Sequence, residues 1–373
     1  MHKLFIIHFQ PLEQYPPVMN LLRFLSKENA GKATIHAIST TPAARQLFYT
    51  DGINIHRQAG WSESMSSLKR GWLYLVFNFG ALWLLIRNRP VKVLYYETMS
   101  AFPAVWYKKF FNKSAELFVH YHEYTSPEEY KTGSLLNRWF HRMEISVMHS
   151  VRWLSHTNTD RLNLCLKDIG GKSPQQTAVL ENHPPSSWIS VVNSRRQERE
   201  GIMKFVYVGA FSLDTLFVKE WATFIQQFPE KYVWDIYSDN YDAAAIEWVR
   251  QLNADNIHFR GAVQYDELPA TLAAYDAGVI LYKGHIPNYV YNAPNKLFEY
   301  LACGLDVLFP DSMVGCGPYA REHSYPKVVA VNFNALTEQI IDKAIDRVGL
   351  ENVTSTFYYE TNLPPLTKLL LHA

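Results

Sequence analysis

Short apolar runs rich in β-branched residues alternate along the chain with longer segments whose apolar positions recur at helical spacing. This alternation predicts β-α-β units, in which parallel strands form a sheet and the connecting helices cover its faces. The runs fall into two series. The first comprises Leu4 to Phe9, Thr34 to Ile38, Val91 to Tyr96, Leu117 to Tyr121, Val151 to Ser155 and Ala178 to Leu180. The second comprises Ile202 to Gly209, Tyr232 to Tyr237, Ile257 to Arg260, Gly278 to Tyr282, Val307 to Pro310 and Val328 to Asn332.

A polar stretch without an apolar face, Asn193 to Gly201, separates the two series. The chain has 373 residues, and a chain of this length usually forms two domains with separate hydrophobic cores. We therefore expect an N-terminal α/β domain over residues 1–195 and a C-terminal one over residues 201–355. The segment 358–373 has leucines at helical spacing, and we expect it to form a helix that returns to the first domain.

The composition narrows the class of protein. Lys plus Arg (36) nearly balance Asp plus Glu (35), so no global field attracts nucleic acid. The three cysteines include no C-x-x-C pair, which argues against a disulfide framework and a structural zinc site. The apolar run up to Phe9 is too short for a signal peptide, so a cytoplasmic location is expected.

The most apolar stretch, Gly71 to Ile86, is flanked by Lys69, Arg70, Arg87 and Arg89. It is shorter than the roughly 20 residues that span a bilayer. Two interpretations remain open. The stretch is either a crossover helix buried against the sheet, or residues 69–89 rest on the anionic inner face of a membrane.

The chemistry is concentrated in the segment YVYNAPNKLFEYLACG, Tyr289 to Gly304. Proline is favoured in a first helical turn and glycine just after a last one, which predicts a helix from near Pro294 to Gly304. Lys296 and Glu299 then share a face. The amides of the helix start, together with Lys296, suit a diphosphate, and Glu299 suits the two hydroxyls of a ribose. The alternative is a surface helix with an ordinary Lys–Glu pair.

The motif NKLFEYLACG, Asn295 to Gly304, resembles that of the retaining GT-B glycosyltransferases of glycosyltransferase family 4, also called glycosyl transferases group 1. Weaker similarities occur in Val179 to Pro185, Phe205 to Ser212 and Phe259 to Tyr282. The resemblance implies an α/β GT-B fold, with two Rossmann-like β/α/β domains facing each other across a cleft. It also implies transfer of a sugar, with retention, from a UDP- or GDP-sugar to a glycan or lipid-linked acceptor in surface polysaccharide biosynthesis.

The resemblance assigns donor-binding roles to particular residues. Glu299 would hold the ribose, and the turn at Gly209 and Ala210 would approach the phosphates. The loop and helix start would face the sugar and diphosphate; they contain Tyr291, Asn292, Pro294, Asn295 and Lys296.

Three departures from the family pattern stand out. The family often has a second glutamate eight residues before Glu299, where this chain has Tyr291, so Tyr289, Tyr291 and Asn292 are expected to contact the sugar instead through stacking and hydrogen bonds. After the glycine turn, where the family has a basic pair, Lys219 is the first basic candidate. Asp306 stands where the family commonly has proline.

Ligands of parallel sheets bind beyond the carboxyl ends of the strands, where His122 and Glu123 follow one predicted strand and Glu97 another. The resemblance places a histidine and an acid at the first of these positions. His122 is expected to hydrogen-bond the sugar or position the acceptor, and Glu123 to orient its ring. The chain contains no D-x-D motif, so no metal or other cofactor is expected.

Two other functions remain open. The chain is either an inactive nucleotide-sugar-binding module of this fold or a GT-B sugar-nucleotide epimerase. The sequence contains no G-x-G-x-x-G after the first strand, no phosphate-binding G-x-x-x-x-G-K-[ST] loop and no G-x-S-x-G elbow. Dehydrogenase, ATPase and serine hydrolase activities are therefore disfavoured.

Overall fold

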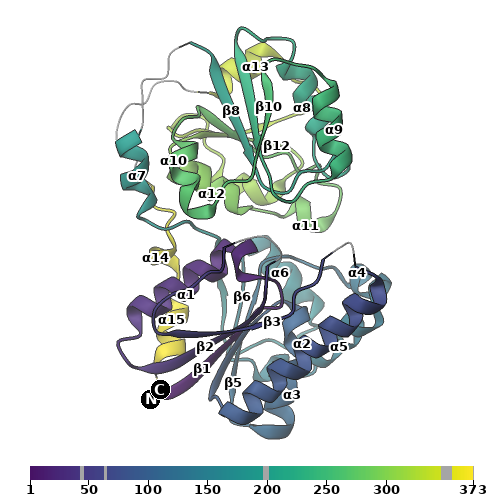
Figure 1. Ribbon diagram of the computed structural model, residues 1–373, viewed down its shortest axis with the longest axis vertical. Helices are drawn as coiled ribbons and strands as arrows, with labels where there is room; N and C mark the ends of the chain where they lie inside the picture. The colour runs from purple at the N-terminus through teal and green to yellow at the C-terminus, as the bar shows by residue number, and fades with distance from the viewer. Residues whose placement is uncertain (43–45, 63–64, 196–200, 346–354, 373) are drawn as a thin grey trace. The chain divides into compact units, whose positions relative to one another are not determined.

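The computed structural model describes residues 1–42, 46–62, 65–195, 201–345 and 355–372 (Figure 1). The chain divides into two compact units. Unit 1 consists of Met1–Glu181 and Tyr359–Ala373, and unit 2 of Asn182–Tyr358. Each unit is built on one parallel sheet with helices between successive strands, so the expectation of two Rossmann-like units is confirmed.

Unit 1 contains a seven-stranded sheet in the order β3-β2-β1-β4-β5-β6-β7. Its strands are β1 His2–Ile7, β2 Ala33–Thr40, β3 Ile53–Gln58, β4 Lys92–Tyr96, β5 Glu116–Tyr121, β6 Trp153–His156 and β7 Thr177–Val179. The sequence predicts all of them except β3. This strand has no apolar run, because it lies at the edge of the sheet and none of its residues is fully buried.

The helices of unit 1 cover both faces of this sheet, and Figure 1 shows α2, α3 and α5 together on one side and α1 with α15 on the other. They are α1 Pro16–Glu28, α2 Ser67–Asn88, α3 Ala101–Trp106, α4 Pro127–Thr132, α5 Leu135–Ile145, α6 Thr159–Asp168, α14 Tyr359–Asn362 and α15 Pro364–Leu371. Short helical turns are η1 Leu12–Gln14, η2 Thr98–Ser100, η3 Tyr107–Phe111 and η4 Met148–Ser150.

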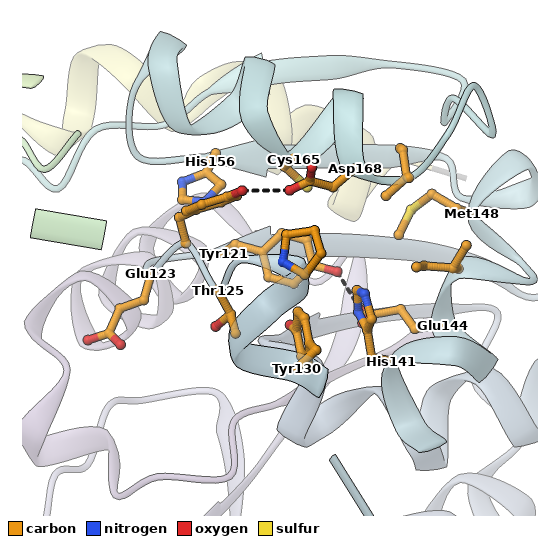
Figure 2. Close-up of a pocket in the computed structure, with 14 residues that line it drawn as sticks. Tyr121, Glu123, Thr125, Tyr130, His141, Glu144, Met148, His156, Cys165 and Asp168 are labelled. Carbon is orange, nitrogen blue, oxygen red and sulfur yellow. Dashed lines mark hydrogen bonds and ion pairs between the residues drawn. The ribbon is translucent and has the colours of Figure 1, made fainter. Parts of the chain in front are cut away.

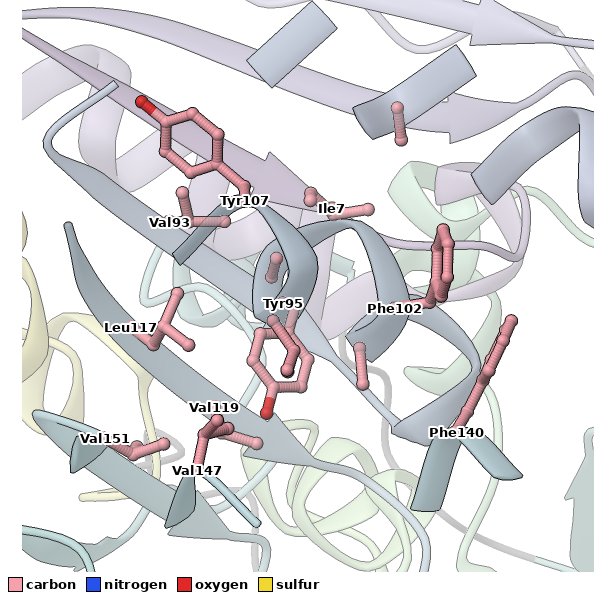
Figure 3. Packing of buried hydrophobic residues seen from close by; sticks show 14 of the residues in the cluster. Ile7, Val93, Tyr95, Phe102, Tyr107, Leu117, Val119, Phe140, Val147 and Val151 are labelled. Carbon is pink, nitrogen blue, oxygen red and sulfur yellow. The ribbon is translucent and has the colours of Figure 1, made fainter. Parts of the chain in front are cut away.

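The core of unit 1 lies between the sheet and the helices α2, α3 and α5 (Figure 3). Val93 and Tyr95 of β4 meet Leu117 and Val119 of β5 there, and Phe102 of α3 packs against them among fully buried neighbours. Strands of a parallel sheet are apolar on both faces because helices cover both. This explains why the inner strands β1, β2, β4, β5 and β6 are detectable in the sequence as apolar runs.

Unit 2 contains a six-stranded parallel sheet in the order β10-β9-β8-β11-β12-β13, and all six strands are predicted by the sequence. They are β8 Met203–Val208, β9 Tyr232–Tyr237, β10 Ile257–Gly261, β11 Ala277–Val279, β12 Asp306–Pro310 and β13 Val328–Val331. The helices are α7 Trp188–Arg195, α8 Val218–Ile225, α9 Ala243–Gln251, α10 Leu268–Leu272, α11 Pro287–Val290, α12 Asn295–Ala302 and α13 Glu338–Ala344. The helical turns are η5 Tyr265–Glu267 and η6 Val314–Tyr319.

Helices α7 and α15 lie near the boundaries between the units in the sequence, and the structure shows to which unit each belongs. Helix α7 precedes the polar stretch, yet Trp188 and Val192 are buried in the core of unit 2, against α10. Helix α15 belongs to unit 1, where His2 Nε2 lies 2.8 Å from the carbonyl of Leu370. Residues 196–200 of the polar stretch and 346–354 at the expected end of the second domain lie outside the described residues.

Helix α12 lies unusually close to the unit-2 sheet because β11 presents a glycine to it. A Cβ atom at Gly278 would stand 2.1 Å from Cδ2 of Tyr300 on α12. The hydroxyl of Tyr300 in turn accepts a 3.1 Å hydrogen bond from the amide of Val208 on β8. Gly278 thus sets the distance between α12 and the sheet.

We predict that Gly278→Ala destabilises the protein by about 1–3 kcal/mol, because the buried Tyr300 ring has to move. Gly71→Ala is the matched control: this glycine lies in α2, a Cβ atom there would meet nothing within 4 Å, and a gain of about 0.5–1 kcal/mol is expected. Urea unfolding followed by circular dichroism measures both. Equal stability of Gly278→Ala and wild type would contradict the close contact.

Candidate functional site

The predicted helix at the centre of the motif is confirmed. Pro294 is the N-cap residue of α12 with an extended backbone, and the amide of Leu297 bonds to its carbonyl at 3.0 Å. The helix ends at Ala302, and Gly304 follows in the left-handed region with φ 69°. The helix start, with the amides of Asn295 and Lys296, stands at the end of the loop that follows α11. Such a helix start attracts anions.

Lys296 is buried among aromatic rings. Its Nζ lies 4.2 Å from the ring centroid of Tyr207 and 4.8 Å from that of Tyr282, and it donates a 3.1 Å hydrogen bond to the Tyr207 hydroxyl. Burial lowers the pKa of Lys296 to about 7, although the charge of Glu299 opposes this shift. A lysine that titrates near neutrality beside a glycine turn is a typical element of a functional site.

Glycine is required at the turn after β8. Gly209 has φ 130°, and a Cβ atom there would stand 3.0 Å from Nζ of Lys296. The backbone of the turn therefore passes directly over the ammonium group. The Tyr207 hydroxyl also donates a 2.6 Å hydrogen bond to the carbonyl of Ala210, which holds the turn to the same ring that contacts Lys296.

Glu299 lies one turn further along α12 and is 7% exposed. Burial raises its pKa to about 7, and Lys296 acts in the opposite direction. The interpretation of α12 as a surface helix is wrong, because residues 296–302 are all buried. Burying a Lys and a Glu costs several kcal/mol of desolvation per ion, so the two residues are poor stabilisers of an empty fold.

The loop before α12 is held from behind by η6. A Cβ atom at Gly315 would collide with the backbone of Tyr291 at 2.4 Å, and the thiol of Cys316 donates to the carbonyl of Asn292 at 3.3 Å. Tyr289 stacks on Tyr282 with centroids 5.1 Å apart. Tyr291 and Asn292 are half-buried residues of this fixed loop.

Two lysines of unit 2, Lys219 and Lys283, follow the glycine turn in the sequence and are candidates for the basic pair of the family. Lys219 lies in the first turn of α8 with an exposed side chain. Lys283, which sequence reasoning missed, follows β11 and donates a 2.8 Å hydrogen bond to the carbonyl of Leu213. The departure at Asp306 has a structural reason: the carboxylate is fully buried and accepts the amide of Lys327 at 2.6 Å.

In unit 1, Glu97 organises the carboxyl ends of β4 and β5. Its Oε1 accepts hydrogen bonds from the amides of His122, at 2.6 Å, and Glu123, at 3.3 Å. Glu97 itself has φ 58° and ψ 158°, a backbone conformation that a non-glycine residue adopts only when its surroundings impose it. Strain of this kind is concentrated at functional sites.

His122 is buried and in contact with other rings. It stacks on Tyr96 at 5.1 Å and meets His120 edge to face at 4.7 Å. Neither ring nitrogen has a hydrogen-bond partner among the described residues, and Oε1 of Glu97 lies 3.6 Å from Nδ1. From the sequence, Glu123 is expected to orient this ring, whereas in the structure Glu97 is the carboxylate that approaches it. Burial is the main cause that lowers the pKa of His122 to about 3, and the positive charge of Arg161 adds to it. The ring is therefore neutral at pH 7 and has one donor and one acceptor.

A cavity of about 180 Å³ opens beside these residues, entirely within unit 1. Its wall combines aromatic rings and carboxylates from the ends of three strands: His8, Tyr15, Tyr96, Glu97 and Glu123. Rings beside carboxylates can hold a polar molecule that has apolar patches, such as a sugar. Sequence reasoning missed His8, although the strand-end rule that selects His122 applies equally to the residue after β1.

A second cavity, of about 30 Å³, lies behind β5 around Glu144 (Figure 2). The carboxylate of Glu144 accepts hydrogen bonds from Tyr121, at 2.5 Å, and Thr98, at 2.8 Å, and burial raises its pKa to about 7. Figure 2 shows the Glu123 side chain pointing away from this cluster. Glu144 is therefore the centre of a polar network in the interior of unit 1.

Within the described part of the chain, no group of three or more His, Cys, Asp or Glu side chains is arranged to hold a metal ion. Nor does any helix among those residues combine the length and the apolar character that crossing a membrane requires.

Solved structures of known proteins share this architecture. The sucrose-phosphate synthase of Thermosynechococcus elongatus matches with TM-score 0.70 and 14% identity over 99% of this chain and 98% of that one. The catalytic domain of starch synthase IV from Arabidopsis thaliana, bound to ADP and acarbose, matches with TM-score 0.56 and 11% identity over 99% and 92%. The UDP-GlcNAc 2-epimerase of Methanocaldococcus jannaschii matches with TM-score 0.60 and 12% identity over 99% of both chains. The expected GT-B fold is thereby confirmed.

No protein-family model matches the chain, and no curated protein matches it by sequence. The similarity is therefore one of fold, and that fold is shared by sugar transferases and a sugar-nucleotide epimerase. Function has to be argued from the residues of the site.

The pKa of Glu97 yields a test of its placement. Burial raises this pKa from 4.5 to about 7, so the folded protein binds the proton more tightly than the unfolded chain does. Its stabilising contribution is complete below about pH 4.5 and is lost as the pH rises through 7. We predict that Glu97→Gln, which does not ionise, gains stability relative to wild type between about pH 5 and about pH 8.

Urea unfolding of both proteins at the two pH values measures this difference. Glu128→Gln on the exposed surface of α4 is the control, and no such gain is expected because the pKa of Glu128 is lowered by Lys131. A stability difference between Glu97→Gln and wild type that does not change with pH would show that folding does not raise the pKa of Glu97.

Proposed function

We propose that the protein is a glycosyltransferase that transfers a hexose from a UDP- or GDP-sugar to a glycan or lipid-linked acceptor. One observation carries the proposal: two ionisable residues, Lys296 and Glu299, are buried within the first turns of α12, and Nζ of Lys296 lies directly under the glycine turn at Gly209. Without a ligand this arrangement costs free energy. A bound diphosphate and ribose would supply the missing interactions.

The donor fits the chemistry of these groups. The amides of Asn295 and Lys296, the helix dipole and the ammonium of Lys296 would stabilise the negative charge of the diphosphate. The backbone at Gly209 and Ala210 would approach the phosphates, with Lys219 as a further cation. Glu299 would accept hydrogen bonds from the ribose, while Tyr291, Asn292 and Pro294 would line the position of the sugar.

The acceptor fits the chemistry of unit 1. The neutral ring of His122 is buried with no hydrogen-bond partner for either nitrogen among the described residues, and Glu123 lines the neighbouring cavity together with Glu97 and Tyr96. In the proposed reaction the bond between the sugar C1 and the diphosphate oxygen breaks. A bond from C1 to an acceptor oxygen forms, and the proton of the acceptor hydroxyl passes to the released diphosphate. We propose that the configuration at C1 is retained. We also propose that no metal or other cofactor is required, because Lys296 and the helix amides supply the positive charge that the diphosphate needs.

The solved structures support a nucleotide-sugar donor. Starch synthase IV is bound to ADP and acarbose, and a second protein of the same fold is a sucrose-phosphate synthase. We place the reaction at the inner face of the cytoplasmic membrane, in assembly of a surface polysaccharide. The epimerase of the same fold favours a second candidate, interconversion of a UDP-sugar without an acceptor. A third, an inactive binding module, is motivated by Tyr291 in place of a glutamate.

We predict that the protein releases UDP or GDP from a nucleotide sugar in the presence of acceptor glycans. Glu299→Ala and Lys296→Met should each lower the rate at least about 100-fold, since each removes charge from a water-excluded site. The matched controls are Glu267→Ala and Lys343→Ala, both exposed in unit 2, which should retain full activity. The assay follows release of the nucleoside diphosphate across a panel of UDP- and GDP-sugars.

Each candidate function has its own outcome in that assay. Interconversion of the donor sugar without an acceptor would identify an epimerase. Nucleotide binding by calorimetry without any turnover would identify a binding module. Neither binding nor turnover with any nucleoside diphosphate would refute the proposed site altogether.

Diphosphate affinity should depend on pH through Lys296. Because the pKa of this lysine is about 7 in the empty protein, its charge is lost as the pH rises, and binding of UDP or GDP should weaken by up to about tenfold per pH unit above 7. Lys296→Arg keeps its charge and should flatten this dependence, although the larger side chain lowers affinity overall. Calorimetry in buffers with different ionisation enthalpies measures the proton uptake. Equal pH profiles for both proteins would exclude Lys296 as the titrating group.

A further inference from the structure

Helix α2 of unit 1 is apolar on two opposite faces. Its inner face, including Phe77, Ala81 and Leu85, is fully buried in the core. The outer face carries five large apolar residues at helical spacing, and all are exposed: Leu68 (89%), Trp72 (66%), Val76 (40%), Phe79 (55%) and Trp83 (55%). The interpretation of this stretch as a helix buried against the sheet is thus correct for one face only.

The apolar surface continues onto neighbouring elements. Helix α2 packs against α3 and η3, and α3 packs against α5, as Figure 1 shows on one side of unit 1. Four more exposed apolar residues lie there: Phe110, Phe111, Leu135 and Trp139. Ring contacts link the elements, with Phe79 and Phe102 at 5.4 Å and Trp106 and Phe110 at 5.2 Å. We call these nine exposed residues on α2, η3 and α5 the aromatic face.

The aromatic face contains nine of the sixteen large apolar residues that are exposed among the described residues. Single exposed apolar residues are ordinary, but contiguous patches of this kind mark surfaces that contact a membrane or another protein. The concentration of exposed apolar residues on one side of unit 1 therefore indicates that a membrane or another protein covers this surface.

The exposed charged residues on and beside α2 and η3 are all positive. Exposed or half-exposed cations flank the aromatic face: Lys69, Arg70, Arg87, Arg89 and Lys109. Between residues 67 and 111 the only acid is Glu97, whose carboxylate is engaged with the amides of His122 and Glu123. The guanidinium of Arg87 lies over the ring of Trp83 at 5.2 Å, so its charge sits at the edge of the apolar surface. No carboxylate of α2, α3 or η3 neutralises these cations.

We propose that the aromatic face docks onto the surface of an anionic lipid bilayer. Tryptophan and phenylalanine in the middle would enter the boundary between headgroups and acyl chains, while the surrounding Lys and Arg side chains would contact lipid phosphates. Cations without an exposed acid on α2 or η3 complement the phosphates of an anionic lipid surface, which favours lipid as the occupant. The docking needs only unit 1 and does not depend on sugar transfer.

Vesicle sedimentation of the full-length protein tests this docking. Wild type should pellet with phosphatidylcholine vesicles containing phosphatidylglycerol, and at least about tenfold less with phosphatidylcholine alone, because each nearby cation adds to the attraction. Replacing Lys69, Arg70, Arg87 and Arg89 by serine should lower binding to the anionic vesicles by more than about tenfold. The matched control replaces four exposed lysines elsewhere, Lys27, Lys32, Lys343 and Lys368, and should bind as wild type does.

A second variant removes apolar contacts rather than charge. Trp72→Ser/Phe79→Ser/Trp83→Ser should still fold, with a modest loss of stability from the contacts of Phe79 with Phe102 and of Trp83 with Arg87, and should lose vesicle binding. Wild-type tryptophan fluorescence should be quenched by brominated lipids, and quenching should disappear in this variant. Three results would overturn the proposal: no pelleting of wild type with anionic vesicles, equal pelleting of the charge variant, or a dimer in light scattering that only the aromatic variant loses.

Discussion

The site in unit 2 depends on one constraint, the burial of the Lys296 ammonium between the rings of Tyr207 and Tyr282. Burial keeps this lysine near its neutral form, with a pKa of about 7, and leaves it poised to recover charge when an anion arrives. Three glycines permit the arrangement. Gly278 admits the Tyr300 ring, Gly209 lets the backbone pass over Nζ, and Gly315 makes room for the loop before α12.

Both units place strained or poorly solvated groups at the carboxyl ends of their strands. In unit 1, Glu97 adopts a left-handed φ while its carboxylate binds two amides, and His122 is buried with both ring nitrogens lacking partners among the described residues. In unit 2, Lys296 and Glu299 are buried at the equivalent edge. Such groups cost free energy in an empty fold, and this cost motivates the proposal of a ligand at each site.

Much of the fold was predictable from the sequence, because strands covered on both faces are apolar throughout. Edge strand β3 escaped prediction, since INIHRQ has no apolar run and none of its residues is fully buried. The motif around α12 was also predictable, because proline, glycine and the spacing of Lys296 and Glu299 act locally. The contacts of Lys296 with Tyr207 and Tyr282 were not, since both rings reach the site from strand ends outside the α12 motif.

The sequence by itself determined the two α/β units, the limits of α12 and the charged pair that it carries, since these follow from local periodicity and turn chemistry. Only the tertiary structure decided that this pair is buried, that Glu97 anchors the backbone of His122 and Glu123, and that α2 exposes one apolar face while burying the other. Burial and exposure depend on which elements pack together. That packing is a property of the folded chain, which no short segment contains.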